Sequence, residues 1–141
     1  MKDSPVVVDS SAIIAILRNE PEKADLIAVL SQNSSNFCSM VTFVESFMVS
    51  TNRNQDTPVD LHLGLLAELG IKTIGLDQDQ ALLAAQAFLR FGKGRHPAKL
   101  NLGDCFSYAL AKSLNAPLLF KGDDFSQTDI VPAIAAGAAG P

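Results

Sequence analysis

The chain has 141 residues, of which 48% are hydrophobic and 18% are charged, and its formal net charge is −4 at pH 7. This length favours one domain with a sizeable core, and the composition excludes an intrinsically disordered chain. The mild negative charge provides no overall basic surface, so a polyanionic partner would have to be met by a local basic patch or through a metal ion.

The first half of the chain predicts two strands, each followed by helices. A β-branched run at residues 5–9, PVVVD, ends abruptly in an acid, as a buried parallel strand does at its carboxyl end. Helices are expected over residues 10–19 and 22–32 because serines can cap the first and Pro21 precedes the second. A second strand is expected over residues 36–40, and a helix over residues 41–54.

The second half continues this alternation. The expected elements are a helix over 59–70, a strand over 71–76, a helix over 79–92, a polar loop over 93–101, a helix over 102–115 and a strand over 116–122. A short edge strand, broken by Pro132, is expected over 129–134. Strands that alternate with helices predict a three-layer α/β/α fold with a mostly parallel central sheet. We expect a single domain over residues 1–134 and a frayed tail over residues 135–141.

Acidic residues fall where ligand sites form in such folds. Asp9 ends the first strand, and Asp104 lies near the start of a late helix. Asp123 and Asp124 follow the last parallel strand, and Glu45 lies about one turn into the helix after the second strand. Because loops and helix N-termini converge beyond the carboxyl ends of parallel strands, we expect these acids to share one edge of the sheet.

Each acid also has a purely structural interpretation. Asp9 could cap the helix that follows it, and Thr42 with Glu45 has the spacing of a capping box. Asp104 is favourable to the dipole of its helix, and the late acidic pair could consist of ordinary turn residues. All of these interpretations nevertheless place carboxylates at the same end of the sheet.

Such a gathering of like charges needs a physical explanation. Two unit charges about 5 Å apart at an effective dielectric of about 20 repel by roughly 3 kcal/mol, so four clustered carboxylates would cost on the order of ten kcal/mol or more. The acids must therefore point into water, be protonated or surround a cation. Hard oxygen ligands around a partly hydrated site suit Mg²⁺ or Mn²⁺.

A resemblance to a known family rests on the segments VVVDSSAIIAIL, LNLGDCFSYALAKSLNAPLLFKGDDF and SQTDI, and on the helix that carries Glu45. Together they look like a PIN domain, specifically the VapC type of ribonuclease toxin from bacterial toxin–antitoxin pairs, over nearly the whole chain. The resemblance implies an endoribonuclease that hydrolyses RNA phosphodiester bonds with Mg²⁺, for which Mn²⁺ is a substitute. It also implies a homodimer and a cognate VapB-like antitoxin that neutralises the enzyme.

Carried over residue by residue, the acidic site of the family maps onto Asp9, Glu45 and Asp104. Many relatives have Asp where this chain has Gly122, so the fourth acidic position is assigned to Asp124 first. These four acids are the expected catalytic residues. The departure at Gly122 leaves the identity of the fourth ligand open.

Phosphodiester hydrolysis needs a deprotonated water and a positive charge that holds the developing anion, and this suggests a role for each acid. The residues expected to bind the metal are Asp9, Asp104 and Asp124. We expect Asp9 and Asp104 to bind it most directly, while Glu45 and Asp124 hold coordinated waters and help to orient or deprotonate the attacking one. Asp123 is the second choice for the fourth acid, and Ser11 is a candidate ligand or support for its neighbours.

A basic cluster precedes Asp104. Its members are Arg90, Lys93, Arg95, His96 and Lys99. In the structural interpretation Arg90 complements a helix C-terminus and the others keep a loop soluble. In the functional interpretation the loop grips RNA phosphates beside the acids, through Arg90, Lys93, Arg95 and His96.

The cysteines argue against other chemistry. Cys38 and Cys105 stand far apart without a paired-cysteine motif, which argues against a zinc cluster and a disulfide framework and favours a reducing cytoplasm. The apolar segment near the start is too short and interrupted for a signal peptide or membrane span, so no membrane association is expected.

Three other classes compete with a nuclease. A haloacid-dehalogenase-type phosphatase needs a second Asp two residues after the first, where this chain has Ser11. A receiver-like signalling domain needs an acidic pair near the first strand, and this chain has one acid there. A degenerate PIN module that binds RNA or a protein partner without cleavage stays open because of Gly122.

Overall fold

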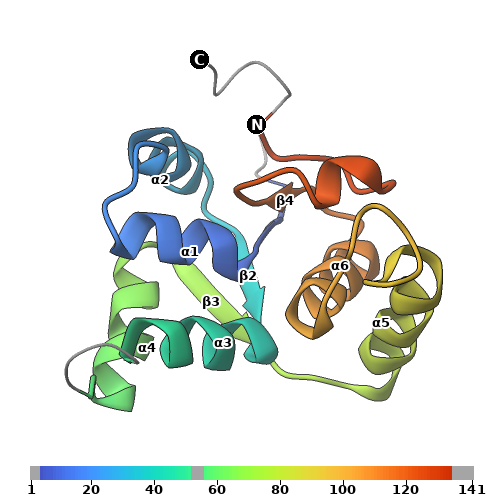
Figure 1. Cartoon of the computed structure of the whole chain (residues 1–141). Helices are drawn as coiled ribbons and strands as arrows, with labels where there is room; N and C mark the ends of the chain where they lie inside the picture. Colours follow the sequence, from blue (N-terminus) through green and yellow to red (C-terminus); the bar gives the residue numbers. More distant parts are fainter. Residues whose placement is uncertain (1–3, 52–55, 135–141) are drawn as a thin grey trace.

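A four-stranded parallel sheet forms the centre of the molecule (Figure 1). The computed structural model describes residues 4–51 and 56–134. The strands are β1 (Val6–Val8), β2 (Asn36–Ser39), β3 (Ile71–Ile74) and β4 (Leu118–Leu119), in the spatial order β3-β2-β1-β4. All three strand pairs are parallel, as the alternation of strands and helices in the sequence predicts.

The helices lie where the apolar periodicity of the sequence predicts them, within a few residues. They are α1 (Ser10–Leu17), α2 (Lys23–Ser31), α3 (Met40–Thr51), α4 (Val59–Glu68), α5 (Gln78–Phe91), α6 (Leu102–Leu114) and the 3₁₀ helix η1 (Phe125–Gln127). Asp77 caps α5 by accepting a hydrogen bond from Gln80 N at 2.8 Å. Asn115 adopts a left-handed conformation (φ 51°) and ends α6.

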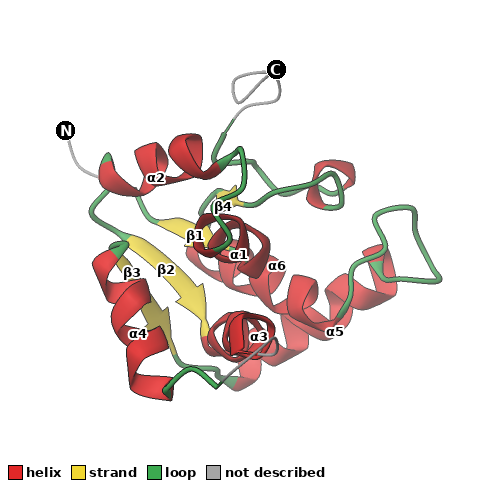
Figure 2. Ribbon diagram, turned by 60° about the vertical axis from the view of Figure 1, so that its left-hand side comes forward, coloured by secondary structure: helices red, strands yellow, loops and turns green. Residues whose placement is uncertain are grey.

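Helices cover both faces of the sheet (Figure 2), which confirms the three-layer α/β/α class. Successive side chains of β1 point to opposite faces: Val7 packs with residues of α5 and α6, whereas Val6 and Val8 pack with residues of α1, α2 and α4. Leu118 and Leu119 of β4 divide between the two faces in the same way. Each fully buried side chain of this kind stabilises the fold by roughly 1.5–3 kcal/mol.

Three helix N-termini meet at the carboxyl end of the sheet. The helix α1 begins at Ser10, shortly after the end of β1, and α3 begins at Met40 immediately after β2. The helix α6 leads back into the parallel strand β4, so its first turn also lies at the carboxyl end. This arrangement positions the candidate site.

The predicted edge strand over residues 129–134 is wrong. The structure has a single bridge there, between Leu118 and Pro132, with hydrogen bonds from Leu118 N to Val131 O (2.9 Å) and from Ala133 N to Leu118 O (2.8 Å). Proline has no N–H to continue a ladder, which limits the pairing to this point. The predicted frayed tail, residues 135–141, lies outside the described residues.

No helix within residues 4–51 and 56–134 combines the length and the apolar character that crossing a bilayer requires.

Candidate active site

Asp9 stands at the junction of β1 and α1 and is held from two sides. Its side chain is 2% exposed. Its Oδ2 accepts a hydrogen bond from Ser11 N at 3.0 Å, so the residue does cap α1. Its Oδ1 accepts a hydrogen bond from Ser107 Oγ at 2.5 Å. The capping role and a role in the site are therefore compatible, because the cap uses only one of the two oxygens.

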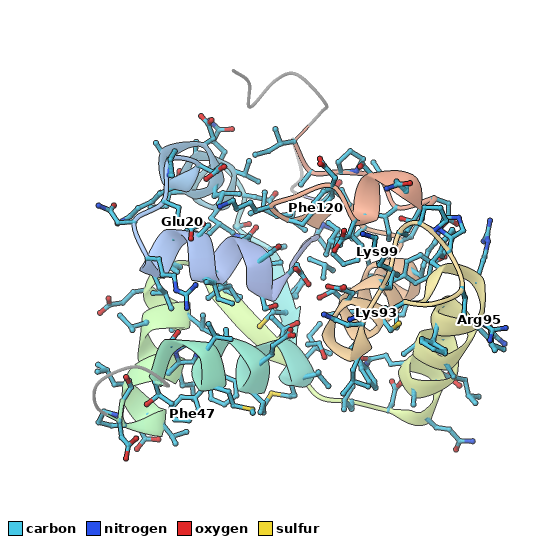
Figure 3. All side chains as sticks on the ribbon, viewed as in Figure 1. Glu20, Phe47, Lys93, Arg95, Lys99 and Phe120 are labelled. Atoms are coloured by element: carbon cyan, nitrogen blue, oxygen red, sulfur yellow. The ribbon has the colours of Figure 1, made fainter. Side chains whose placement is uncertain are left out.

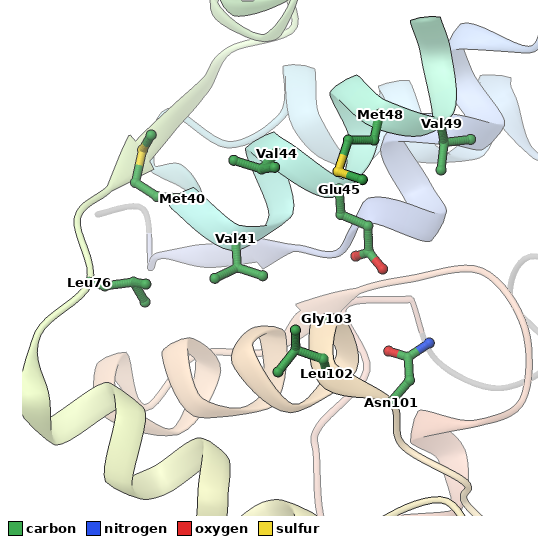
Figure 4. Close-up of a pocket in the computed structure, with 10 residues that line it drawn as sticks. All are labelled: Met40, Val41, Val44, Glu45, Met48, Val49, Leu76, Asn101, Leu102 and Gly103. Atoms are coloured by element: carbon green, nitrogen blue, oxygen red, sulfur yellow. The ribbon is translucent and has the colours of Figure 1, made fainter. Parts of the chain in front are cut away.

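Glu45 extends from α3 toward the first turn of α6 (Figure 4). Its Oε1 accepts a hydrogen bond from Ser10 Oγ at 2.7 Å. Burial raises the pKa of Glu45, the hydrogen bond from Ser10 lowers it, and the charge of Asp9 raises it again, with a net upward shift. The expected capping box of Thr42 and Glu45 is wrong, because α3 begins before Thr42 and both side chains contact other elements.

Gly103 provides the space in which the Glu45 carboxylate lies. A Cβ at this position of α6 would collide with Oε1, Oε2 and Cδ of Glu45. Gly103 was not among the residues predicted for the site. The available signal was a glycine inside the first turn of a predicted helix, where no turn or left-handed conformation calls for one.

Asp104 lies in the first turn of α6 and forms a capping box with Asn101. Asp104 N donates to Asn101 Oδ1 (2.9 Å), and Asn101 N donates to Asp104 Oδ2 (3.0 Å). Burial raises the pKa of Asp104, the hydrogen bond from Asn101 lowers it, and the charges of Asp9, Glu45 and Asp124 raise it, so that the pKa is about 7. The carboxylates of four separate segments therefore lie within electrostatic reach of one another.

The two late acids differ in their relation to this group. Asp124 is exposed, precedes η1 and is one of the charges that act on Asp104. Asp123 is also exposed, but it is absent from the charges that shift Asp104, and its carbonyl accepts the Ser126 hydroxyl at 2.6 Å. Of the two late acids, Asp124 is therefore the one whose charge acts on Asp104.

The four acids, Asp9, Glu45, Asp104 and Asp124, lack a cationic partner in the part of the chain that the structure describes. The ion pairs found there involve other carboxylates. Hard oxygen donors of this kind fit Mg²⁺ or Mn²⁺. However, no three Asp, Glu, His or Cys side chains within residues 4–51 and 56–134 are placed so that they could hold one metal ion together. Metal binding would therefore require these carboxylates to move toward one another.

Ser11 connects the loop after β4 to α1. Its Oγ accepts a hydrogen bond from Lys121 N at 3.0 Å. The Lys121 ammonium lies 2.5 Å from Glu20 Oε1 and 3.6 Å from Glu22 Oε1. These contacts fix the segment that leads to Asp124, so Ser11 supports the site through the backbone. Lys121 was not predicted to support the site, because its partners lie about a hundred residues away in the chain.

The basic residues at the end of α5 and in the loop before α6 differ in their contacts within the protein, although Arg90, Arg95 and both lysines are exposed. Arg90 lies 3.7 Å from Asp129 Oδ2, and His96 Nδ1 accepts a hydrogen bond from Ala98 N at 3.0 Å. Arg95 Nε donates to Leu89 O at 3.2 Å. Lys93 and Lys99 are exposed, and they lie on the side of the loop nearer the middle of the molecule, whereas Arg95 lies at its outer edge (Figure 3).

The chain is similar to known proteins both in sequence family and in fold. The family model described as the PIN domain matches residues 6–131. The structure of VapC20 from Mycobacterium tuberculosis, a toxin that cleaves the sarcin–ricin loop, superposes with a TM-score of 0.71 at 14% identity, covering 89% of this chain and 96% of that one. VapBC2 of Rickettsia felis, solved with a DNA fragment from its promoter, has a TM-score of 0.68 at 11% identity and covers 90% and 95%. At these identities the two neighbours show a shared fold.

Similarity in sequence narrows the family. Ribonuclease VapC42 of Mycobacterium tuberculosis is 43% identical over 129 residues, which cover 91% of this chain and 98% of that protein. The chain therefore belongs to the PIN domain family and, within it, to the VapC ribonucleases.

Proposed function

We propose that the chain is a Mg²⁺- or Mn²⁺-dependent endoribonuclease whose catalytic residues are Asp9, Glu45, Asp104 and Asp124. One observation carries this proposal: burial and the charges of three remote acids raise the pKa of Asp104 to about 7, and none of the four acids has a cationic partner within the described residues. A bound divalent ion would offset this repulsion. The membership of this chain among the VapC ribonucleases supports RNA as the substrate.

The metal would be held by Asp9, Asp104 and Asp124. When bound, it would supply positive charge that stabilises the developing phosphate anion and lowers the pKa of the attacking water. Asp9 is prepared for this role because its oxygens are already oriented by Ser11 N and Ser107 Oγ. Asp104 would turn from its cap, which costs about 1 kcal/mol for one hydrogen bond at a helix N-terminus.

Glu45 would orient or deprotonate the attacking water. Its carboxylate is fixed by Ser10 Oγ on one side and accommodated by the missing side chain of Gly103 on the other. Burial raises the pKa of Glu45, and a carboxylate with a raised pKa is a better proton acceptor. Its Oε2 accepts no hydrogen bond from the residues that the structure describes, so this oxygen is free for a water molecule.

The basic loop would grip the RNA backbone. Lys93 and Lys99 are exposed and lie nearer the middle of the view in Figure 3 than Arg95, whereas Arg90, Arg95 and His96 each have a contact within the protein. We expect the two lysines to contribute most of the phosphate contacts. Changing Lys93 and Lys99 to Gln should weaken RNA binding and reduce the slope of log K against log salt by about 0.7 for each phosphate that is no longer neutralised. Arg95→Gln is the matched control, and an equal reduction of the slope in that variant would contradict this assignment.

The proposed partners are a VapB-like antitoxin and a second copy of the chain, in the cytoplasm. The structural similarity to VapBC2 of Rickettsia felis supports the antitoxin as a partner. An apolar pocket of about 580 Å³ beside Glu45 supports an interface, because its rim includes Val44, Met48 and Leu102, which are 48%, 60% and 73% exposed. Measuring the molar mass of the native protein and of Met48→Lys by light scattering tests the homodimer: both species monomeric would contradict it.

Incubation of purified protein with total RNA tests the main proposal. Cleavage at discrete positions should require Mg²⁺ or Mn²⁺ and should disappear in Asp104→Asn. Cut ends mapped by sequencing would also identify the substrate. RNA binding without any cuts would favour the second candidate, a PIN module that binds without cleavage, which Gly122 and the separated carboxylates support.

A further inference from the structure

Two hydroxyl groups form a buried chain behind Asp9. Ser107 lies on α6 with a side chain that is 0% exposed, and its Oγ donates to Asp9 Oδ1 at 2.5 Å across 98 positions of sequence. Thr42 lies on α3, is also 0% exposed, and places its Oγ1 at 3.3 Å from Ser107 Oγ. These hydrogen bonds therefore connect α3 and α6 to the end of β1.

Counting hydrogens fixes the direction of this chain. A serine hydroxyl has one hydrogen to donate, and a carboxylate oxygen can only accept. Since Ser107 gives its hydrogen to Asp9, the hydrogen between Thr42 and Ser107 belongs to Thr42. The order is Thr42 to Ser107 to Asp9. In such a chain each bond polarises the next, so the charge-assisted bond to Asp9 is strengthened by the threonine behind it.

We propose that Thr42 and Ser107 form a positioning device that fixes the orientation of Asp9 for a divalent metal ion. This inference rests on the proposed function. Ser11 N holds Asp9 Oδ2 and Ser107 holds Oδ1, so rotation of the carboxylate would break one of the two bonds. Each oxygen accepts one of these hydrogen bonds, so its second lone pair would be the one that binds a metal ion. Ser107 does not touch the reacting atoms and acts only through Asp9.

The burial of these hydroxyls distinguishes this role from simple packing. A buried hydroxyl without a hydrogen bond costs about 1–3 kcal/mol, and the Ser107 hydroxyl avoids this cost through its bonds to Asp9 and Thr42. Cys105, Ala109 and Leu110 of the same helix are buried without any polar chain of this kind. The hydroxyl at position 107 is therefore explained by what it does for Asp9.

Direct measurement of metal binding tests the proposal. Mn²⁺ is titrated into metal-free protein and followed by electron paramagnetic resonance, alongside RNA cleavage at saturating metal. Ser107→Ala should weaken Mn²⁺ binding by about 10- to 100-fold, as loss of a group that orients a metal ligand typically does. Ser107→Cys, which keeps the volume but donates weakly, should behave like Ser107→Ala. Ser113→Ala is the matched control on the same helix, because its hydroxyl bonds only Leu110 O, and it should bind Mn²⁺ as the native protein does.

A double-mutant cycle tests the hydrogen-bond chain from Thr42 through Ser107 to Asp9. Thr42→Val should weaken Mn²⁺ binding in the native background and have no further effect in Ser107→Ala, because the threonine acts through the serine. If the native protein binds Mn²⁺ and both Ser107 variants bind it equally tightly, the positioning role is overturned, while the proposed metal site stands. If the effects of the two changes on Mn²⁺ binding are additive, Thr42 does not act through Ser107, and the proposed hydrogen-bond chain is overturned. A native protein that binds no Mn²⁺ would overturn the proposed metal site and this inference with it.

Discussion

Two carboxylates associated with the helix α6 experience opposite surroundings. Asp129 accepts a hydrogen bond from Tyr108 OH (2.7 Å), and Lys112 Nζ and Arg90 lie at 2.8 Å and 3.7 Å from its Oδ2. Burial alone would raise the pKa of Asp129, but the hydrogen bonds from Lys112 and Tyr108 outweigh burial and lower it. Burial, and then the charges of the acids Asp9, Glu45 and Asp124, raise the pKa of Asp104 to about 7.

The contrast separates an acid whose charge the protein compensates from an acid that we propose binds a cation. The charge of Asp129 is compensated by side chains of the protein, so its ionised form contributes to the fold. The charge of Asp104 is not compensated within the described residues, so its ionised form is disfavoured until a cation arrives. Functional acids can be recognised by what surrounds them rather than by their position at a helix terminus.

The largest difference between the two acids should be in catalysis. Asp104→Asn should reduce metal-dependent RNA cleavage by more than about 100-fold, since it removes a proposed metal ligand. In metal-free buffer its unfolding free energy should be equal to or above that of the native protein, because repulsion is relieved while the Asn oxygen can still accept from Asn101. Urea unfolding and cleavage assays measure both effects. Full activity, or a large loss of stability without metal, would contradict the assignment.

A smaller loss of activity should follow from a substitution that displaces the Glu45 side chain but leaves Glu45 itself unchanged. Gly103→Ala should push the Glu45 carboxylate out of its place and lower cleavage by about tenfold, or about 1.4 kcal/mol. The matched control is Gly64→Ala in α4, where nothing lies within 4 Å of the new Cβ. It should leave cleavage unchanged and stabilise the protein by about 0.5–1 kcal/mol. Equal cleavage by the native protein and Gly103→Ala would show that the glycine is not needed.

The raised pKa of Asp104 predicts a pH dependence of stability in the metal-free protein. From about pH 4 to about pH 7, the unfolded chain has released the proton of Asp104 while the folded chain keeps it, so the unfolding free energy should fall as pH rises. The expected decrease is on the order of 1 kcal/mol after allowance for solvent screening. Asp9, Glu45 and Asp124 are the charges that act on this group.

Urea unfolding as a function of pH measures this effect, and saturating Mg²⁺ should abolish the decrease because the metal displaces the proton. Asp104→Asn is the control and should show a flatter profile. If the unfolding free energy of the native protein instead rises between about pH 4 and about pH 7, the acids are solvated and do not lie close to one another.

The smallest effect is expected at the compensated acid. Asp129→Asn should lower the unfolding free energy by about 0.5–1 kcal/mol, because a partly exposed ion pair contributes little, and it should leave RNA cleavage unchanged. High salt should reduce the difference in stability between the variant and the native protein. Loss of cleavage in this variant would remove the distinction between the two acids.

Most of the fold could be predicted from the sequence because its signals are local. The β-branched run of β1 and the apolar periodicity of α3, α5 and α6 predict those elements within a few residues. The edge strand expected after residue 128 is wrong, because pairing of a proline-containing segment depends on a partner strand elsewhere in the chain.

The candidate site was only partly predictable for the same reason. The grouping of Asp9, Glu45 and Asp104 followed from the rule that parallel strands end at a common edge. Ser107 and Lys121 could not be found, because each acts through a contact with a residue far away in sequence. For Gly103 the only signal was a glycine inside the first turn of a predicted helix, which does not reveal its contact with Glu45. The distance between the carboxylates also could not be predicted, since it depends on side-chain rotamers.

The loop between α5 and α6 is closed at its base by a bridge between Gly92 and Leu100. Lys93 N donates to Leu100 O and Leu100 N donates to Phe91 O, both at 3.0 Å. Residues 93–99 therefore form a lobe whose two ends are fixed to each other, and Asp104 follows shortly after this closure. We therefore expect changes within the lobe to disturb the backbone that carries Asp104 only slightly. If the proposed roles hold, substrate choice can diverge among homologous enzymes by replacement of this lobe, without a change in the acidic residues.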